Sequence, residues 1–166
     1  SEMGYGKPKD KLPGTQPYPP ETINGIPMPF LLKQILQYAD SLDGVTDMLE
    51  SAQKTNQYVF VVGDGRTANG VPDARAFITT SQFCNTYQIN QNPLSYPFPQ
   101  RPDILFGSHK NEICFQELGK YHGEITPEIL MKQIIPKIAM DSNLQSVVYD
   151  PANLQCWVSN ANDLEP

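Results

Sequence analysis

Basic runs and long apolar runs are both missing from this 166-residue sequence. Its formal net charge is −6, and no cluster of Lys and Arg offers the cations that neutralise a phosphate backbone. The sequence therefore argues against a nucleic-acid partner. No apolar stretch approaches the roughly 20 residues that a membrane-spanning helix needs, so no membrane span is predicted.

Histidine and cysteine are scarce, with two and three residues respectively. Cys84, Cys114 and Cys156 lie far apart and form no CxxC pair, a pattern that favours free, buried thiols over a disulfide framework or a metal site. On a predicted helix, His109 and Cys114 point about 140° apart, which argues against a Cys–His catalytic pair. His122 lies beyond that helix, and no carboxylate stands at ligand spacing beside either histidine, so neither a metal nor a cofactor is predicted.

The overall composition is that of a globular protein. Hydrophobic residues make up 39% and charged residues 18% of the chain, and its length suits one domain spanning 1–166. Prolines concentrate in an irregular opening segment, 1–28, which holds only a short strand at its start, and in a loop at 91–107.

Hydrophobic spacing predicts helices and strands in a regular order. The predicted elements are a helix from Pro29, a helix at about 42–53, a strand within 56–65, a returning strand from 74 to about 87, a helix at about 109–121, a helix from Thr126, and two strands within 144–161 around an Asp-Pro turn. The glycine-rich segment 63–70, GDGRTANG, lacks the ending of a phosphate-binding loop and is predicted to be the first hairpin loop. The order predicts an α+β fold with mainly antiparallel sheets covered by helices.

Local signals refine these elements. Ser41 is a predicted N-cap, and Asp40, Asp43 and Asp47 form a capping and solvated acidic face. Val59 belongs to a nearly continuous apolar run at 58–62 that predicts a central strand covered on both faces.

The C-terminal third carries further signals. Ser108 is a predicted helix cap, and Gly123 ends that helix. In the next helix Pro136 predicts a kink or an end, while Leu130, Ile134 and Ile138 share one face. In the last hairpin, alternation places Val147 with Tyr149 and places Leu154, Cys156 and Val158 together, and Cys156 is predicted to be buried.

Five segments together resemble one protein family. They are SEMGYG, NGIPMPFLLKQIL, TNQYVFVVGDG, ELGKYHGEITPE and AMDSNLQSVVYDPANLQCWVSNA, and they cover nearly the whole chain in order. In that order and spacing they are similar to the C-terminal half of the penicillin acyltransferase-like (isopenicillin N acyltransferase-like) cysteine hydrolases. These enzymes belong to the N-terminal-nucleophile (Ntn) superfamily, with relatives among the acid ceramidases and choloylglycine hydrolases.

The resemblance implies a four-layer αββα sandwich and a precursor that cleaves itself to expose an N-terminal cysteine. That cysteine attacks an amide or thioester carbonyl with its own α-amino group as base, and an acyl-enzyme forms. The implied activity is that of an amidohydrolase acting on linear amide bonds, or of an acyltransferase when an amine accepts the acyl group. The implied ligand is a small acyl amide or thioester.

The resemblance also assigns residues. SEMGYG is similar to an interior strand end, so Ser1 is expected to be the edge of a fragment or a cut end and not the nucleophile. The nucleophilic cysteine is then expected outside this chain, which alone would be inactive. Relatives carry an oxyanion asparagine in a Thr-Asn-His-like segment after the hairpin's second strand. The nearest segment is 80–82, Thr-Ser-Gln, which departs from that pattern and leaves Asn85 and then Asn143 as candidates, against a structural role in a turn or cap. Lys33 stands where relatives carry arginine and is expected to make a surface or inter-layer contact.

A different class of function stays open beside the enzyme. The chain is alternatively a non-catalytic binding or structural module that retains the fold without the nucleophile, or an α+β domain outside the family. Half of a layered sandwich leaves sheet edges and apolar faces uncovered. We therefore expect the chain to associate with the missing half of its domain or with another copy.

Overall fold

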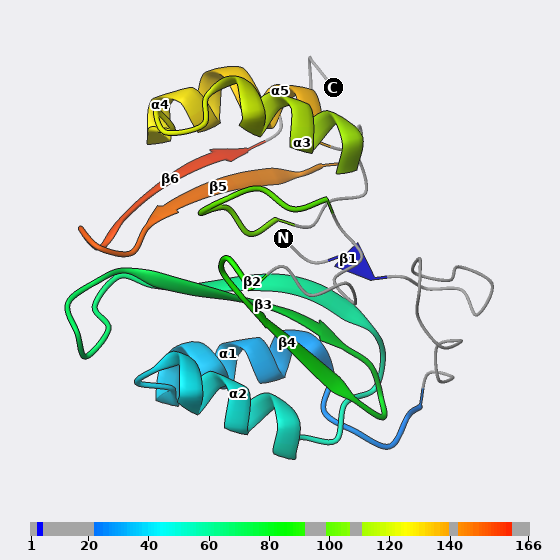
Figure 1. Cartoon of the computed structure of the whole chain (residues 1–166). Coiled ribbons are helices and arrows are strands. Elements are labelled where there is room, and N and C mark those ends of the chain that lie inside the picture. The colour runs from blue at the N-terminus through cyan, green and yellow to red at the C-terminus, as the bar shows by residue number, and fades with distance from the viewer. Residues whose placement is uncertain (1–2, 5–21, 92–98, 107–110, 140–142, 161–166) are drawn as a thin grey trace.

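Two antiparallel sheets and two groups of helices make up the described part of the chain (Figure 1). The computed structural model describes residues 3–4, 22–91, 99–106, 111–139 and 143–160. The elements in chain order are β1 (Met3–Gly4), α1 (Met28–Tyr38), α2 (Leu42–Ser51), β2 (Tyr58–Asp64), β3 (Asp73–Thr79), β4 (Cys84–Gln88), α3 (Asn111–Lys120), α4 (Pro127–Ile129), the π-helical turn η1 (Leu130–Ile134), α5 (Ile135–Ile138), β5 (Gln145–Asp150) and β6 (Gln155–Asn160).

The elements are stacked in layers. Helices α1 and α2 lie on one side of the β1-β2-β3-β4 sheet, the β5–β6 hairpin lies on the other side, and α3, α4 and α5 lie beyond the hairpin (Figure 1). Every pairing between neighbouring strands is antiparallel. The predicted α+β class with antiparallel sheets is therefore confirmed.

The first helix pair forms as its sequence signals predict. Met28, Leu31 and Ile35 recur at helical spacing and are buried, and a proline occupies the first turn of α1. The Ser41 hydroxyl accepts a hydrogen bond from the Gly44 N–H at 3.1 Å, which satisfies one free donor at the start of α2. The predicted cap is confirmed, and α2 ends at Ser51, two residues before its expected end at about 53.

A core between this helix pair and the sheet holds the two together. The Phe60 and Phe77 rings stack with their centroids 5.5 Å apart, and Leu49 is fully buried against them. β2 occupies an interior place in the sheet, as predicted, and buries Val59 and Phe60 on opposite faces. Val61 is 39% exposed, so the covering of β2 is incomplete beyond Phe60.

The segment after the first hairpin contains two strands, where one was predicted. The expected strand from 74 to about 87 is interrupted by a turn at 80–83. The Thr80 hydroxyl accepts hydrogen bonds from the N–H groups of Gln82 (3.2 Å) and Phe83 (3.1 Å), and the Thr80 N–H donates to the Phe83 carbonyl at 2.9 Å. A threonine side chain thus makes a turn without glycine or proline, which explains why the sequence did not reveal it.

The second group of helices has its own core. Phe106, Cys114, Leu118 and Ile134 are buried together, with Leu130 and Ile138 packed against them, so the predicted shared face is confirmed. The Thr126 hydroxyl caps α4 by accepting from the Ile129 N–H at 3.2 Å. The helix does not end at Pro136, because the π-helical turn η1 widens it just before the proline. Gly123 ends the α3 segment with φ of +85°, whereas Ser108 lies outside the described residues.

The β5–β6 hairpin forms around the predicted Asp-Pro turn. The face that carries Cys156, which was predicted to be buried, is the exposed one. Val148 pairs with Trp157 and is buried, whereas Tyr149 pairs with Cys156 and both are exposed. The prediction that Cys156 is buried is therefore wrong. Alternation placed Cys156 on the correct strand face relative to its neighbours, but it does not determine which of the two faces points inward.

One close contact joins the two sheets. The turn after β5 lies against the β2–β3 hairpin, where a Cβ added at Gly65 would overlap the backbone of Pro151 and Ala152. A Cβ at Gly63 would stand 3.6 Å from the Pro151 ring, an ordinary contact. Glycine at 65 therefore allows a backbone approach that no other residue would permit.

Candidate functional site

Asn85, the first oxyanion candidate, lies on β4 opposite Ile78 of β3. Phe60, Phe77 and Thr86 share the face toward α1 and α2, so alternation puts Asn85 on the face that looks toward the second sheet. Its side chain is exposed. The returning strand was expected to run to about 87 and so to contain Asn85, and this is corrected: β3 ends at Thr79, and the turn at Thr80 places Asn85 in a separate strand, β4.

Asn143, the second candidate, lies two residues before β5 and is partly buried. Its Nδ2 donates to the Ser146 hydroxyl at 2.8 Å. This bond occupies one amide donor in a local contact at the start of the hairpin. Asn85 lies on β4 of the larger sheet and Asn143 in the segment that leads into β5, and no hydrogen bond joins them among the described residues.

The three cysteines have three different environments. All are free: Cys114 is buried, Cys84 is partly buried and Cys156 is exposed. Burial raises the pKa of the Cys114 thiol to about 11, so at neutral pH the thiolate that would act as a nucleophile is almost absent. Burial also raises the pKa of the Cys84 thiol, against an opposing effect of the nearby Lys54 ammonium.

Lys54 is a buried cation that the sequence did not single out. Its Nζ donates to the carbonyl oxygens of Leu49 at 2.7 Å and Ala52 at 2.9 Å, at the C-terminal end of α2. These carbonyls lack helical partners and carry the negative end of the helix dipole, which suits a cation. Burial nevertheless lowers the pKa of Lys54. A lysine one residue beyond the predicted helix end at about 53 is the only sequence signal for this cap.

A second buried charge, Glu117 on α3, clamps the C-terminal helices. Its carboxylate accepts from Lys120 at 2.6 Å and from Lys137 at 2.8 Å, and its side chain is 8% exposed. The hydrogen bonds from Lys120 and Lys137 lower the pKa of Glu117. Since both partners are lysines on the helical group itself, we assign this trio a structural role.

Gln57, at the start of β2, is a further buried polar residue that sequence reasoning missed. The residue is 6% exposed, and its Nε2 has no hydrogen-bond partner. Nothing in the sequence marks it, because a glutamine before an apolar strand is ordinarily a surface residue.

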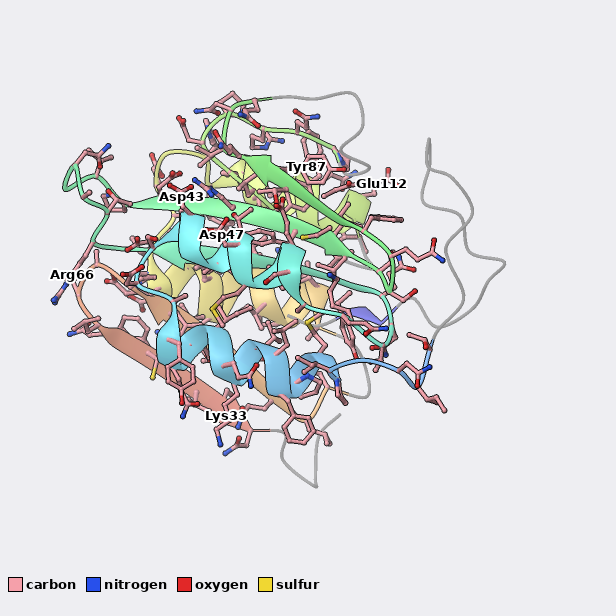
Figure 2. All side chains as sticks on the ribbon, turned by 90° about the horizontal axis from the view of Figure 1, so that it is seen from below. Lys33, Asp43, Asp47, Arg66, Tyr87 and Glu112 are labelled. Atoms are coloured by element: carbon pink, nitrogen blue, oxygen red, sulfur yellow. The ribbon has the colours of Figure 1, made fainter. Side chains whose placement is uncertain are left out.

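The acidic face of α2 is accounted for by structural contacts. Asp43 pairs with Arg75 Nη2 at 2.6 Å, and the same guanidinium donates to the Leu42 carbonyl and the Thr46 hydroxyl. Asp47 is exposed on α2, and Lys33 lies exposed on the outer side of α1 (Figure 2), so Lys33 has the surface role expected of it.

The part of the chain that the structure describes contains neither a cluster of metal ligands nor a helix of membrane-spanning character. There, no three His, Cys, Asp or Glu side chains group closely enough to hold a metal ion. His122 Nε2 lies 2.9 Å from the Pro102 carbonyl oxygen, and His109 lies outside the described residues. None of the described helices is both long and apolar enough to cross a bilayer.

No known family, no curated protein and no solved structure matches this chain.

Proposed function

We propose that this chain is the C-terminal portion of a cysteine Ntn hydrolase or acyltransferase. The proposal rests on the family resemblance of the five segments and is supported by where they lie. SEMGYG contributes β1 to the edge of the larger sheet, beside the β2 strand of TNQYVFVVGDG. The order of helices, sheet, sheet and helices agrees with the layering of that superfamily (Figure 1).

The proposed chemistry uses a cysteine outside this chain. Its thiolate attacks the carbonyl carbon of an amide or thioester, and the tetrahedral intermediate collapses to an acyl-enzyme as the amine or thiol leaves with a proton. Water or an amine then takes the acyl group. The cysteines within the chain suit this role poorly, since burial raises the pKa of Cys114 and of the partly buried Cys84, and Cys156 is exposed on β6.

Asn85 carries the proposal within this chain. An oxyanion needs a donor aimed at the reacting oxygen, and a side-chain amide is a neutral donor suited to it. Asn85 presents such an amide on the sheet face toward the second sheet, and it is exposed there. Asn143 already donates to Ser146, so Asn85 is the stronger choice.

One observation favours the non-catalytic alternative. The segment 80–82, where relatives carry a Thr-Asn-His-like sequence, is a tight turn closed by the Thr80 side chain. A module that retained the fold for binding alone would tolerate this change.

The proposal is tested in the complete protein with a panel of N-acyl amines and acyl thioesters. We expect release of the acid, and a mass increase equal to the acyl group on an N-terminal cysteine. Asn85→Ala should lower kcat by about 10²–10³. The matched control is Gln82→Ala, which removes an exposed side-chain amide from the adjacent turn and should leave kcat unchanged.

The outcomes separate the two functions. If the wild type turns over and Asn85→Ala stays within about threefold, Asn85 is structural and Asn143→Ala is examined next. If no substrate is turned over and no upstream cysteine is exposed, the hydrolase proposal fails and the binding module replaces it.

A further inference from the structure

The sequence contains the dipeptide Asn-Gly twice, at Asn24–Gly25 and at Asn69–Gly70. In such a pair the backbone nitrogen of the glycine can attack the side-chain carbonyl carbon of the asparagine, because glycine has no Cβ to crowd the approach. A new N–C bond closes a succinimide ring, the C–N bond of the side-chain amide breaks, and the proton of the glycine nitrogen departs with the ammonia that leaves. Water then opens the ring at either carbonyl and gives aspartate or isoaspartate.

Hydrogen bonds on the reacting groups oppose this reaction at Asn69–Gly70. The Gly70 N–H donates to the Thr67 carbonyl at 2.8 Å, so the nitrogen that must attack is engaged. The Asn69 side-chain oxygen accepts from the Val71 N–H at 3.1 Å and from the Thr67 hydroxyl, so the amide that must be attacked is engaged as well. Both groups have to leave their partners before a ring can close. The turn therefore protects this pair, although it is exposed.

The reacting groups of Asn24–Gly25 are not engaged in this way. Among the described residues, neither the Asn24 side chain nor the Gly25 N–H takes part in a hydrogen bond. The backbone N–H of Asn24 donates to the Thr22 hydroxyl at 3.1 Å, and this bond involves neither reacting group. Asn24 is exposed. Its amide can therefore turn onto the Gly25 nitrogen without losing a hydrogen bond, and water can reach the ring that forms.

The main chain around this pair is held at both ends. The Thr22 N–H donates to the Thr55 carbonyl at 2.8 Å, and the Ile26 N–H donates to the Gln53 carbonyl at 2.7 Å. A Cβ added at Gly25 would lie 2.9 Å from the same Gln53 oxygen, so the two segments are in close contact. Isoaspartate continues the chain through its side-chain carbonyl and adds one carbon to the main chain. A longer chain between two fixed hydrogen bonds cannot keep the spacing of both.

We propose that Asn24 is a modification site, at which the Gly25 nitrogen displaces ammonia and the resulting isoaspartate releases the segment before α1 from the segment after α2. Water is the only other reactant. Asn69, in the same dipeptide, is held unreacted by its turn. The site lies apart from Asn85, and its chemistry does not depend on the function proposed above.

The first test compares the two asparagines within one sample. The complete protein is incubated in warm, mildly alkaline buffer and digested with trypsin, which places Asn24 in the peptide 12–33 and Asn69 in the peptide 67–75. Fragmentation of each peptide locates the exchange of an amide for a carboxyl group. We expect Asn24 to react at least about tenfold faster than Asn69, because at least two hydrogen bonds must break at Asn69.

Unfolding provides the control for this comparison. In concentrated urea the hydrogen bonds of both sites are lost, so the two Asn-Gly pairs should react at similar rates. A folded protein in which Asn69 reacts as fast as Asn24, or faster, would overturn the proposal. So would a ratio that is the same in urea as in buffer, because the difference would then come from the local sequence.

The second test follows the release of the segment. Asn24→Gln lengthens the side chain so that a five-membered ring cannot form, and Asn69→Gln is the matched control in the other pair. During incubation the wild type and Asn69→Gln should lose melting temperature, and the backbone amide of Thr22 or Ile26 should lose protection from hydrogen exchange. Asn24→Gln should keep both. Isoaspartate at position 24 with unchanged protection of both amides would contradict the proposed release.

Discussion

Replacing Gly65 by alanine tests the contact between the two sheets. The added methyl group would overlap the backbone carbonyl carbon of Pro151 and the backbone nitrogen of Ala152. Backbone cannot move aside by changing a rotamer, so the whole turn between β5 and β6 must retreat. Overpacking of this kind costs about 1–3 kcal/mol, or a fall of roughly 2–4 °C in melting temperature per kcal/mol at this chain length.

Two neighbouring glycines are matched controls. A Cβ at Gly63 meets the Pro151 ring at 3.6 Å, so Gly63→Ala should change the free energy of unfolding by no more than about 0.5 kcal/mol. Gly70 has φ of +76° and nothing within 4 Å of its added Cβ. Gly70→Ala should therefore cost about 1–2 kcal/mol of backbone strain without moving the turn.

Trp157 makes the assay specific. It is the only tryptophan of the chain, and it pairs with Val148 within the hairpin whose turn would move. We expect acrylamide quenching of its fluorescence to rise in Gly65→Ala and to stay at the wild-type value in Gly63→Ala and Gly70→Ala. Urea unfolding of the same proteins gives the free energies. If Gly65→Ala matches Gly63→Ala in both measurements, the turn does not lie against the first hairpin and the reasoning is refuted.

Three further predictions use the cysteines, Glu117 and the exposed apolar side chains. Because its pKa is about 11 against the ordinary 9.0, Cys114 holds ~100-fold less thiolate than an ordinary cysteine at about pH 8. A thiol reagent should therefore label the exposed Cys156 first and Cys114 only on unfolding. Rapid modification of Cys114 in folded Cys156→Ser would contradict its burial. The folded-state pKa of Glu117 lies below the ordinary 4.5, so its carboxylate stabilises the fold above pH 4.5 and this contribution is lost as pH falls through the lowered pKa. Below about pH 4.5 the melting temperature should therefore drop less steeply with falling pH in Glu117→Gln than in the wild type. Parallel curves for the two proteins would rule this out. Tyr149 and Val158 are 71% and 55% exposed on one face of the hairpin, so at micromolar concentration the chain should sediment as an associated species. Tyr149→Lys should weaken the association, and the control Gln133→Lys should not. A wild-type monomer would count against association.

The elements were predictable where their signals are local. Ser41 and Thr126 correctly predict helix starts, because an N-cap needs only a side-chain hydroxyl and the backbone of the next three residues. The Asp64–Asp73 connection contains Asp-Gly and Asn-Gly, and Gly70 adopts the positive φ that such a loop requires. The Thr80 turn was missed because a single hydroxyl replaces the usual glycine or proline.

The orientation of the last hairpin depended on tertiary structure. Both faces of β5–β6 carry apolar side chains. The packing of the hairpin buries Val148 and partly buries its partner Trp157, and it leaves Tyr149 and Cys156 exposed. The same limit applies to Glu117, because an acidic residue is ordinarily exposed and its burial depends on Lys137, 20 residues away.

Lys54 and Gln57 together explain why the candidate site could not be completed from sequence. Both are buried polar residues in the short connection from α2 to β2. The Lys54 donors find two carbonyls, so this connection can satisfy a buried donor on the side of α2. Gln57 lies on the other face of the sheet, where its Nε2 meets no acceptor. Whether a buried polar side chain in this connection finds a partner is therefore decided by the tertiary packing around it, and the local sequence pattern does not encode that packing.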